Sequence, residues 1–172
     1  MTLERMWAGW RSGYVDDLAA VGRESRDDAE CVFCRIMASD CPDDETFVLW
    51  RGRSCLAILN AYPYTNGHLM VMPMRHVGDL AELEPSETSE LWAGVQASMG
   101  AIMAAYQPEG MNMGANLGKA AGAGVPGHLH VHCLPRWSGD TNFVTSIASL
   151  RVLPETLATS HEKLLAAWPQ NL

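Results

Sequence analysis

Apolar residues along this chain form short runs of strand length and one long run with helical spacing. Five short runs predict β-strands, at residues 46–50, 54–60, 68–74, 111–117 and 128–134. Between the third and fourth runs, apolar residues recur every three or four positions, which predicts an amphipathic helix over 87–106 with Ser86 as its N-cap. A shorter pattern from Leu157 to Trp168 predicts a closing helix.

The order of these elements indicates the fold class. The strands are grouped around one long helix instead of alternating with helices, so we expect an α+β fold with an antiparallel sheet of about five strands, a long central helix and a C-terminal helix. The 172 residues, 48% of them hydrophobic, suffice for one domain. We expect this domain at 31–172, preceded by an extension at 1–30 that carries Trp7 and Trp10 as aromatic anchors and ends in charged residues.

Composition excludes several classes of protein. A net charge of −8 is unfavourable for a general nucleic-acid binder, which needs a basic surface. The sequence contains no run of 18 apolar residues, so it predicts no membrane span. Residues 1–15 lack the apolar core of a secretory signal. The five cysteines are odd in number and unevenly spaced, which is typical of a reduced, cytoplasmic protein.

Half of the six histidines lie within five residues, at positions 128, 130 and 132. They alternate with Leu129, Val131 and Cys133, so a strand would place all three imidazoles on one face and the apolar residues on the other. A neutral imidazole is a nucleophile, a general base and a metal ligand near pH 7. This row therefore indicates a functional site, with a solvated strand face as the simpler alternative.

The histidine row and its flanks resemble the histidine-triad (HIT) superfamily, whose members bind nucleotides and cleave or transfer at the α-phosphate. The closer resemblance is to the bacterial branch related to diadenosine tetraphosphate phosphorylase (ATP adenylyltransferase). It is carried by residues 7–11, 59–64, 66–68 and 135–143. It implies the HIT-like antiparallel sheet and a homodimer.

The resemblance assigns the nucleophile to His130, which would form a covalent nucleotidyl-histidine, and places His132 at the phosphate and the departing group. It implies a nucleotidyltransferase acting on dinucleoside polyphosphates, with inorganic phosphate as the second substrate. A hydrolase of adenosine phosphoramidates or other nucleotide monoesters is the nearest alternative. A nucleotide sensor or adaptor without catalysis is an alternative of another class.

A glycine-rich loop precedes the triad and predicts a phosphate cradle, because glycine lets backbone N–H groups approach an anion closely. Its candidate phosphate-binding residues are Asn116, Lys119, Gly122 and Gly124. Many HIT proteins carry Gln-Ser where this chain has Gly124-Val125, which leaves the leaving-group chemistry open.

Nucleoside recognition is expected upstream of the triad. The resemblance places Asn60 at the ribose hydroxyls, and Ile58 two residues earlier either packs on the base or belongs to the core. We expect His68 to be a buried, hydrogen-bonded histidine near the site. Trp137 and Phe143 would belong to a flap over the substrate or to the dimer interface.

Cys31 and Cys34 form a C-x2-C pair, which fits tetrahedral zinc if two further ligands are supplied. The resemblance to zinc-containing bacterial HIT proteins supplies them as His76 and His128. A redox pair and ordinary buried thiols are the alternatives. Cys41, Cys55 and Cys133 are expected to be packing residues.

Overall fold

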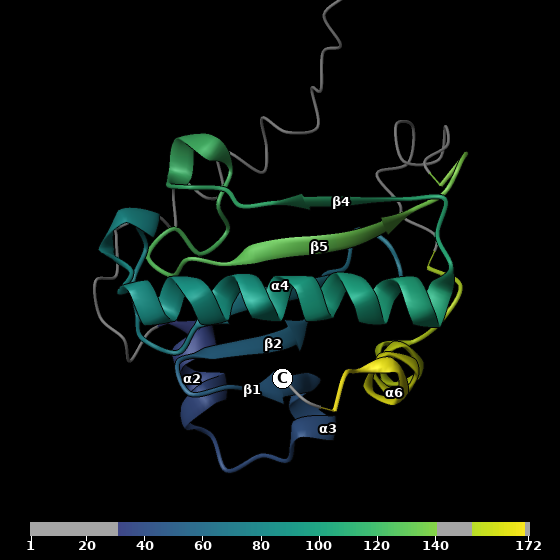
Figure 1. The fold of residues 1–172 in the computed structure, drawn as a ribbon, viewed down its shortest axis with the longest axis horizontal. Coiled ribbons are helices and arrows are strands. Elements are labelled where there is room, and N and C mark those ends of the chain that lie inside the picture. Colours follow the sequence, from purple (N-terminus) through teal and green to yellow (C-terminus); the bar gives the residue numbers. More distant parts are fainter. Residues whose placement is uncertain (1–30, 141–152, 171–172) are drawn as a thin grey trace, which may run out of the picture.

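A computed structural model of the chain describes residues 31–140 and 153–170. A single antiparallel sheet forms its centre (Figure 1), with the strands in the order β1-β2-β3-β5-β4. The strands are β1 (Val48–Arg51), β2 (Cys55–Leu59), β3 (Leu69–Pro73), β4 (Gly110–Gly114) and β5 (Val131–Arg136). The predicted α+β class and the five-stranded sheet are confirmed.

Two helices cover one face of the sheet. The long helix α4 (Pro85–Tyr106) runs along this face, and α6 (Leu157–Ala167) packs near its C-terminal end (Figure 1). Two shorter helices, α2 (Val32–Ala38) and α3 (Asp43–Thr46), come before the first strand. Single 3₁₀ turns, η2 (Leu80–Glu82) and η3 (Lys119–Ala121), lie in the loops before α4 and before β5.

The sheet has a buried cluster on each face. The larger cluster joins the sheet to α4 and includes Leu129, Val131 and Cys133. The smaller cluster lies on the opposite face and contains Phe33 of α2 together with Ile58 and Met70. Successive residues before and along β5 therefore alternate between the two faces, as the sequence pattern predicts.

Helix α4 begins two residues earlier than expected. The prediction of Ser86 as N-cap is wrong, because the cap is Glu84 and Pro85 is the first helical residue. Proline suits this position, since its missing N–H would have no partner within the helix. The backbone N–H of Glu84 instead donates to the Glu87 carboxylate at 2.9 Å.

Other boundaries shift by a few residues. The first strand starts at Val48, because residues 43–46 form α3, and β4 ends at Gly114.

The extension at 1–30, its charged end and Phe143 lie outside the described residues. Within residues 31–140 and 153–170, the structure has no helix of the length and hydrophobicity that crossing a membrane requires.

Candidate active site and metal centre

The three histidines lie on the sheet face opposite α4. His132 is on β5, where its cross-strand partner is Met70, which pairs in turn with Ile58 of β2. His128 and His130 come just before the strand and are buried, at 0% and 5% exposed. The rings of His130 and His132 meet edge to face with their centroids 4.9 Å apart. The shared face predicted from the alternation is therefore present.

A backbone carbonyl orients His130. Its Nδ1 lies 2.8 Å from the carbonyl oxygen of His128, which only accepts, so Nδ1 must carry the proton. The lone pair is then on Nε2. Burial lowers the pKa of His130, although the carbonyl contact opposes that shift. A neutral imidazole with its lone pair on a fixed nitrogen has the properties of a nucleophile.

His132 has the complementary arrangement. The backbone N–H of Tyr64 donates to Nδ1 of His68 at 3.1 Å, which puts the His68 proton on Nε2. That nitrogen donates to Nδ1 of His132 at 2.8 Å. The proton of a neutral His132 is therefore on Nε2, as a hydrogen-bond donor. Burial and the nearby His130 lower the pKa of His132 to about 4, so the ring is neutral near pH 7.

Four metal-binding side chains converge beside the triad. One ligand atom each from Cys31, Cys34, His76 and His128 lies within 4.8 Å of all the others. Nδ1 of His128 is 3.4 Å from Sγ of Cys31 and 3.5 Å from Sγ of Cys34, while Nδ1 of His76 is 3.3 Å from Sγ of Cys34. Two sulfurs and two imidazole nitrogens form the donor set of a tetrahedral structural zinc site.

The comparisons with known proteins agree with this geometry. A family model described as the HIT domain matches residues 42–139. The chain belongs to the HIT domain family. It is 39% identical over 169 residues to the AP-4-A phosphorylase of Mycobacterium tuberculosis (strain ATCC 25618 / H37Rv), covering 98% of this chain and 86% of that protein.

Two further HIT relatives are informative. The adenylylsulfatase HINT3 of Arabidopsis thaliana is 33% identical over 111 residues, which cover 64% of this chain and 54% of that protein. The crystal structure of a Zn-bound histidine triad family protein from Mycobacterium smegmatis is 32% identical, with a TM-score of 0.66, and the match covers 82% of this chain and 94% of that one.

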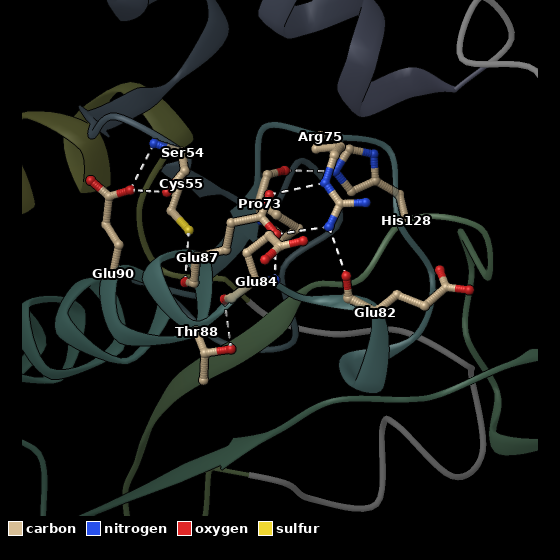
Figure 2. A network of polar contacts seen from close by, with 10 residues as sticks. All are labelled: Ser54, Cys55, Pro73, Arg75, Glu82, Glu84, Glu87, Thr88, Glu90 and His128. Atoms are coloured by element: carbon tan, nitrogen blue, oxygen red, sulfur yellow. Dashed lines mark hydrogen bonds and ion pairs between the residues drawn. The ribbon is translucent and has the colours of Figure 1, made fainter.

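The segment from Pro73 to Arg75, which leads to His76, is held by hydrogen bonds at both ends (Figure 2). Nε2 of His128 donates to the Pro73 carbonyl at 2.8 Å. Arg75 donates two hydrogen bonds to the Glu87 carboxylate, at 3.0 and 2.7 Å, and one to the carbonyl oxygen of Glu82. The end of β3 is thereby held between the segment that leads into β5 and the start of α4. His76 follows directly on this fixed segment.

The two residues expected to contact the nucleoside, Asn60 and Ile58, both lie near the triad. Asn60 directly follows β2, with Nδ2 at 3.3 Å from Nδ1 of His68, and its Oδ1 accepts a hydrogen bond from the backbone N–H of Tyr62. Ile58 shares the triad face, although it is only 3% exposed and packs in the smaller cluster. His68 is fully buried and hydrogen-bonded, as expected.

The glycine-rich loop connects β4 to the triad at the end of the sheet where β5 begins (Figure 1). Nδ2 of Asn116 donates to the Gly122 carbonyl at 3.4 Å, which joins the two ends of the turn. Gly122 has φ +87°, a conformation that favours glycine. Lys119 and Gly124 are exposed in the same loop. The loop thus has accessible backbone beside the triad.

The contacts of two aromatic residues with the histidines were not predicted. Phe33 lies between the paired cysteines and packs against His128 and His130, with centroid distances of 5.4 and 5.2 Å. The ring of Tyr64 lies 4.6 Å from that of His68 and 5.8 Å from that of His132. The only sequence signal for either residue is its position inside a motif already noted, between the cysteines or just before Gly67-His68.

None of the five cysteines is in a disulfide. Cys55 and Cys133 are buried packing residues, and burial raises the pKa of each thiol to about 12. The expectation that Cys41 packs in the core is wrong, since this residue is exposed between α2 and α3.

Proposed function

We propose that this HIT protein is a nucleotidyltransferase that cleaves dinucleoside polyphosphates at the α-phosphate through a covalent nucleotidyl-His130. The observation that carries the proposal is the pair of fixed tautomers. His130 has its lone pair on Nε2, and the adjacent His132 has its proton on Nε2. An attacking lone pair and a proton donor are the two groups that in-line displacement at phosphorus needs on the enzyme.

The first step forms a bond from Nε2 of His130 to the α-phosphorus and breaks the bond to the bridging oxygen. His132 donates its Nε2 hydrogen bond to that oxygen as negative charge develops on it. With diadenosine tetraphosphate the departing group is ATP, and adenylate stays on His130. In the second step an oxygen of inorganic phosphate attacks the adenylate phosphorus, the P–N bond breaks, and ADP leaves.

The substrate contacts are assigned to the residues around the triad. Asn60 would bind the ribose hydroxyls and Ile58 would contact the base. The loop supplies Asn116, Lys119 and the backbone of Gly122 and Gly124 for the polyphosphate. Support comes from the position of Asn60 next to His68 and from the exposed glycine backbone at the loop. Glycines in such a turn permit an anion to approach N–H groups.

Phosphorolysis and hydrolysis are separated by products. With phosphate present, diadenosine tetraphosphate should give ATP and ADP in equal amounts. Equal cleavage rates with and without phosphate, with AMP as the second product, would support the alternative, a HIT hydrolase of adenosine phosphoramidates or other nucleotide monoesters. Two observations favour testing this hydrolase alternative. The chain has Gly124-Val125 where many HIT proteins have Gln-Ser, and it is similar to an adenylylsulfatase. Nucleotide binding without turnover would support the sensor.

We further propose that Cys31, Cys34, His76 and His128 bind one structural zinc ion. The donor set fits, because Nε2 of His128 is occupied by the Pro73 carbonyl and Nδ1 faces the two cysteine sulfurs. An outer hydrogen bond of this kind is typical of metal-ligating histidines. Zinc would fasten α2 to the segment just before β5 that carries the nucleophile, and the His128 side chain would take no part in the chemistry.

The protein is proposed to be a homodimer of the cytoplasm. Strand β4 is an edge of the sheet, and unpaired edges are ready pairing sites. Met103 of α4 and Met113 of β4 are 45% and 50% exposed. The absence of disulfides among five cysteines suits a reducing compartment.

A further inference from the structure

The start of α2, which carries Cys31 and Cys34, also contacts the proposed nucleophile His130. Phe33 is the one buried residue of α2, at 7% exposed. Its ring meets the His128 ring edge to face at 81° and the His130 ring at 60°. We propose that Phe33 is a positioning residue, which holds the imidazole of His130 in the orientation needed for attack. The proposal rests on the role of His130 in the proposed function.

Three contacts restrict the His130 ring. The His128 carbonyl fixes Nδ1, the His132 ring meets the His130 ring edge to face, and Phe33 packs against the His130 ring from α2. A single hydrogen bond leaves a ring able to rock about that bond. The two ring contacts are therefore what hold Nε2 in one direction. Of these, Phe33 comes from the element that the metal centre would fasten.

His128 links the two sites chemically. Its side chain faces the cysteine sulfurs through Nδ1, and its carbonyl oxygen accepts the proton of His130 Nδ1. Phe33 lies against the rings of His128 and His130, and in the sequence it stands between Cys31 and Cys34. The segment with the two cysteines is thus connected to His130 in two ways. One is through His128, whose ring faces the cysteine sulfurs and whose carbonyl accepts from His130, and the other is through the ring of Phe33.

The test is Phe33→Leu in the zinc-loaded, full-length protein. Small misplacements of a reacting group cost up to about 10²-fold in rate, so we expect kcat for diadenosine tetraphosphate to fall at least about tenfold. KM should stay within about twofold, and zinc content should not change. In NMR relaxation of ¹³C-histidine-labelled protein, the His130 ring should become more mobile, while the His128 carbonyl keeps the ring's proton on Nδ1. Ile36→Ala, which removes packing from the same helix, is the control and should leave the mobility of the His130 ring unchanged.

A Phe33→Leu variant that keeps its zinc, its kcat and a rigid His130 ring overturns the proposal, because Phe33 would then only fill space. If Phe33→Leu loses its fold, Phe33→Met gives the same test with a side chain that adapts to irregular gaps. The mobility measurement needs no turnover. A wild type that cleaves no dinucleotide, with a more mobile His130 ring in the variant, would therefore overturn the proposed function and leave the positioning role supported.

Discussion

His68 and His132 are joined by a hydrogen bond of 2.8 Å from Nε2 of His68 to Nδ1 of His132. The direction of this bond follows from the Tyr64 backbone N–H, which occupies Nδ1 of His68. His68, which comes just before β3, thereby determines which nitrogen of a neutral His132 carries the proton. Under the proposed mechanism this buried histidine would take part in the leaving-group chemistry through His132.

Replacing His68 with leucine should impair the departure of the leaving group. Without the donor at Nδ1, His132 is free to place its proton there and loses the Nε2–H donor. Proton donation of this kind contributes about 10²–10⁴-fold, so we expect kcat to fall about 10²-fold with a small change in KM. Steady-state kinetics check this, with His161→Gln as control, a buried histidine bonded to the Val48 carbonyl. Unaltered kcat in His68→Leu would contradict the assigned role.

Removal of a metal ligand should release the metal and loosen α2. Cys34→Ser replaces a thiolate ligand, and structural zinc contributes directly to folding free energy. We expect zinc to fall from about one atom per chain to a small fraction, with a lower melting temperature, in elemental analysis and thermal unfolding. Cys41→Ser, at an exposed cysteine outside the cluster, should change neither quantity. Wild type purified without metal and stable in chelator would contradict the zinc proposal.

Glu155 should stabilise the protein at neutral pH. Its partial burial alone would raise the pKa, but hydrogen bonds from Lys163, Tyr106 and Ser160 lower the pKa of its carboxyl to about 2. A carboxyl with a lowered pKa stabilises the fold above its unfolded pKa, and this contribution is lost as pH falls through the folded value. We expect Glu155→Gln to lower the free energy of unfolding by about 1–3 kcal/mol at pH 7.

Urea unfolding at pH 7 and near pH 2.5 measures the effect of this substitution. The difference between wild type and Glu155→Gln should shrink toward the lower pH. Glu162→Gln, at an exposed position of α6, should have little effect at either pH. A constant difference at both values would show that the carboxylate charge is not the source of the stabilisation.

The edge strand β4 should carry the dimer. A charge at Met113, which is 50% exposed, would place a carboxylate in an apolar contact between subunits. We expect Met113→Glu to shift the protein from dimer to monomer in sedimentation at micromolar concentration. Glu162→Gln is again the control, and a wild type that sediments as a monomer would rule out the proposed homodimer.

Much of the site was predictable because its chemistry follows the period of a strand. Alternation from His128 to Cys133 predicted which side chains share a face, and the structure places them so. The resemblance supplied His76 and His128 as partners of the cysteine pair, and their ligand atoms converge. These predictions depended on local geometry or on motif positions.

The remainder depends on contacts between distant parts of the chain. The proton position on His132 is determined by His68, 64 residues away in sequence. Phe33 reaches the triad only because α2 docks on that face of the sheet. The error at the start of α4 is a local exception, since the helix begins at Pro85 with Glu84 as its N-cap and proline suits the first helical position. Sequence patterns carry no information on how such distant groups meet.

The most direct test of the covalent mechanism is mass spectrometry of protein quenched within seconds of mixing with diadenosine tetraphosphate in phosphate-free buffer. We predict a mass gain of one adenylate on the peptide that contains His130, its loss on addition of phosphate, and its absence in His130→Ala. Rapid cleavage of the dinucleotide with no adduct on that peptide, or with undiminished turnover in His130→Ala, would contradict the nucleotidyl-His130 mechanism.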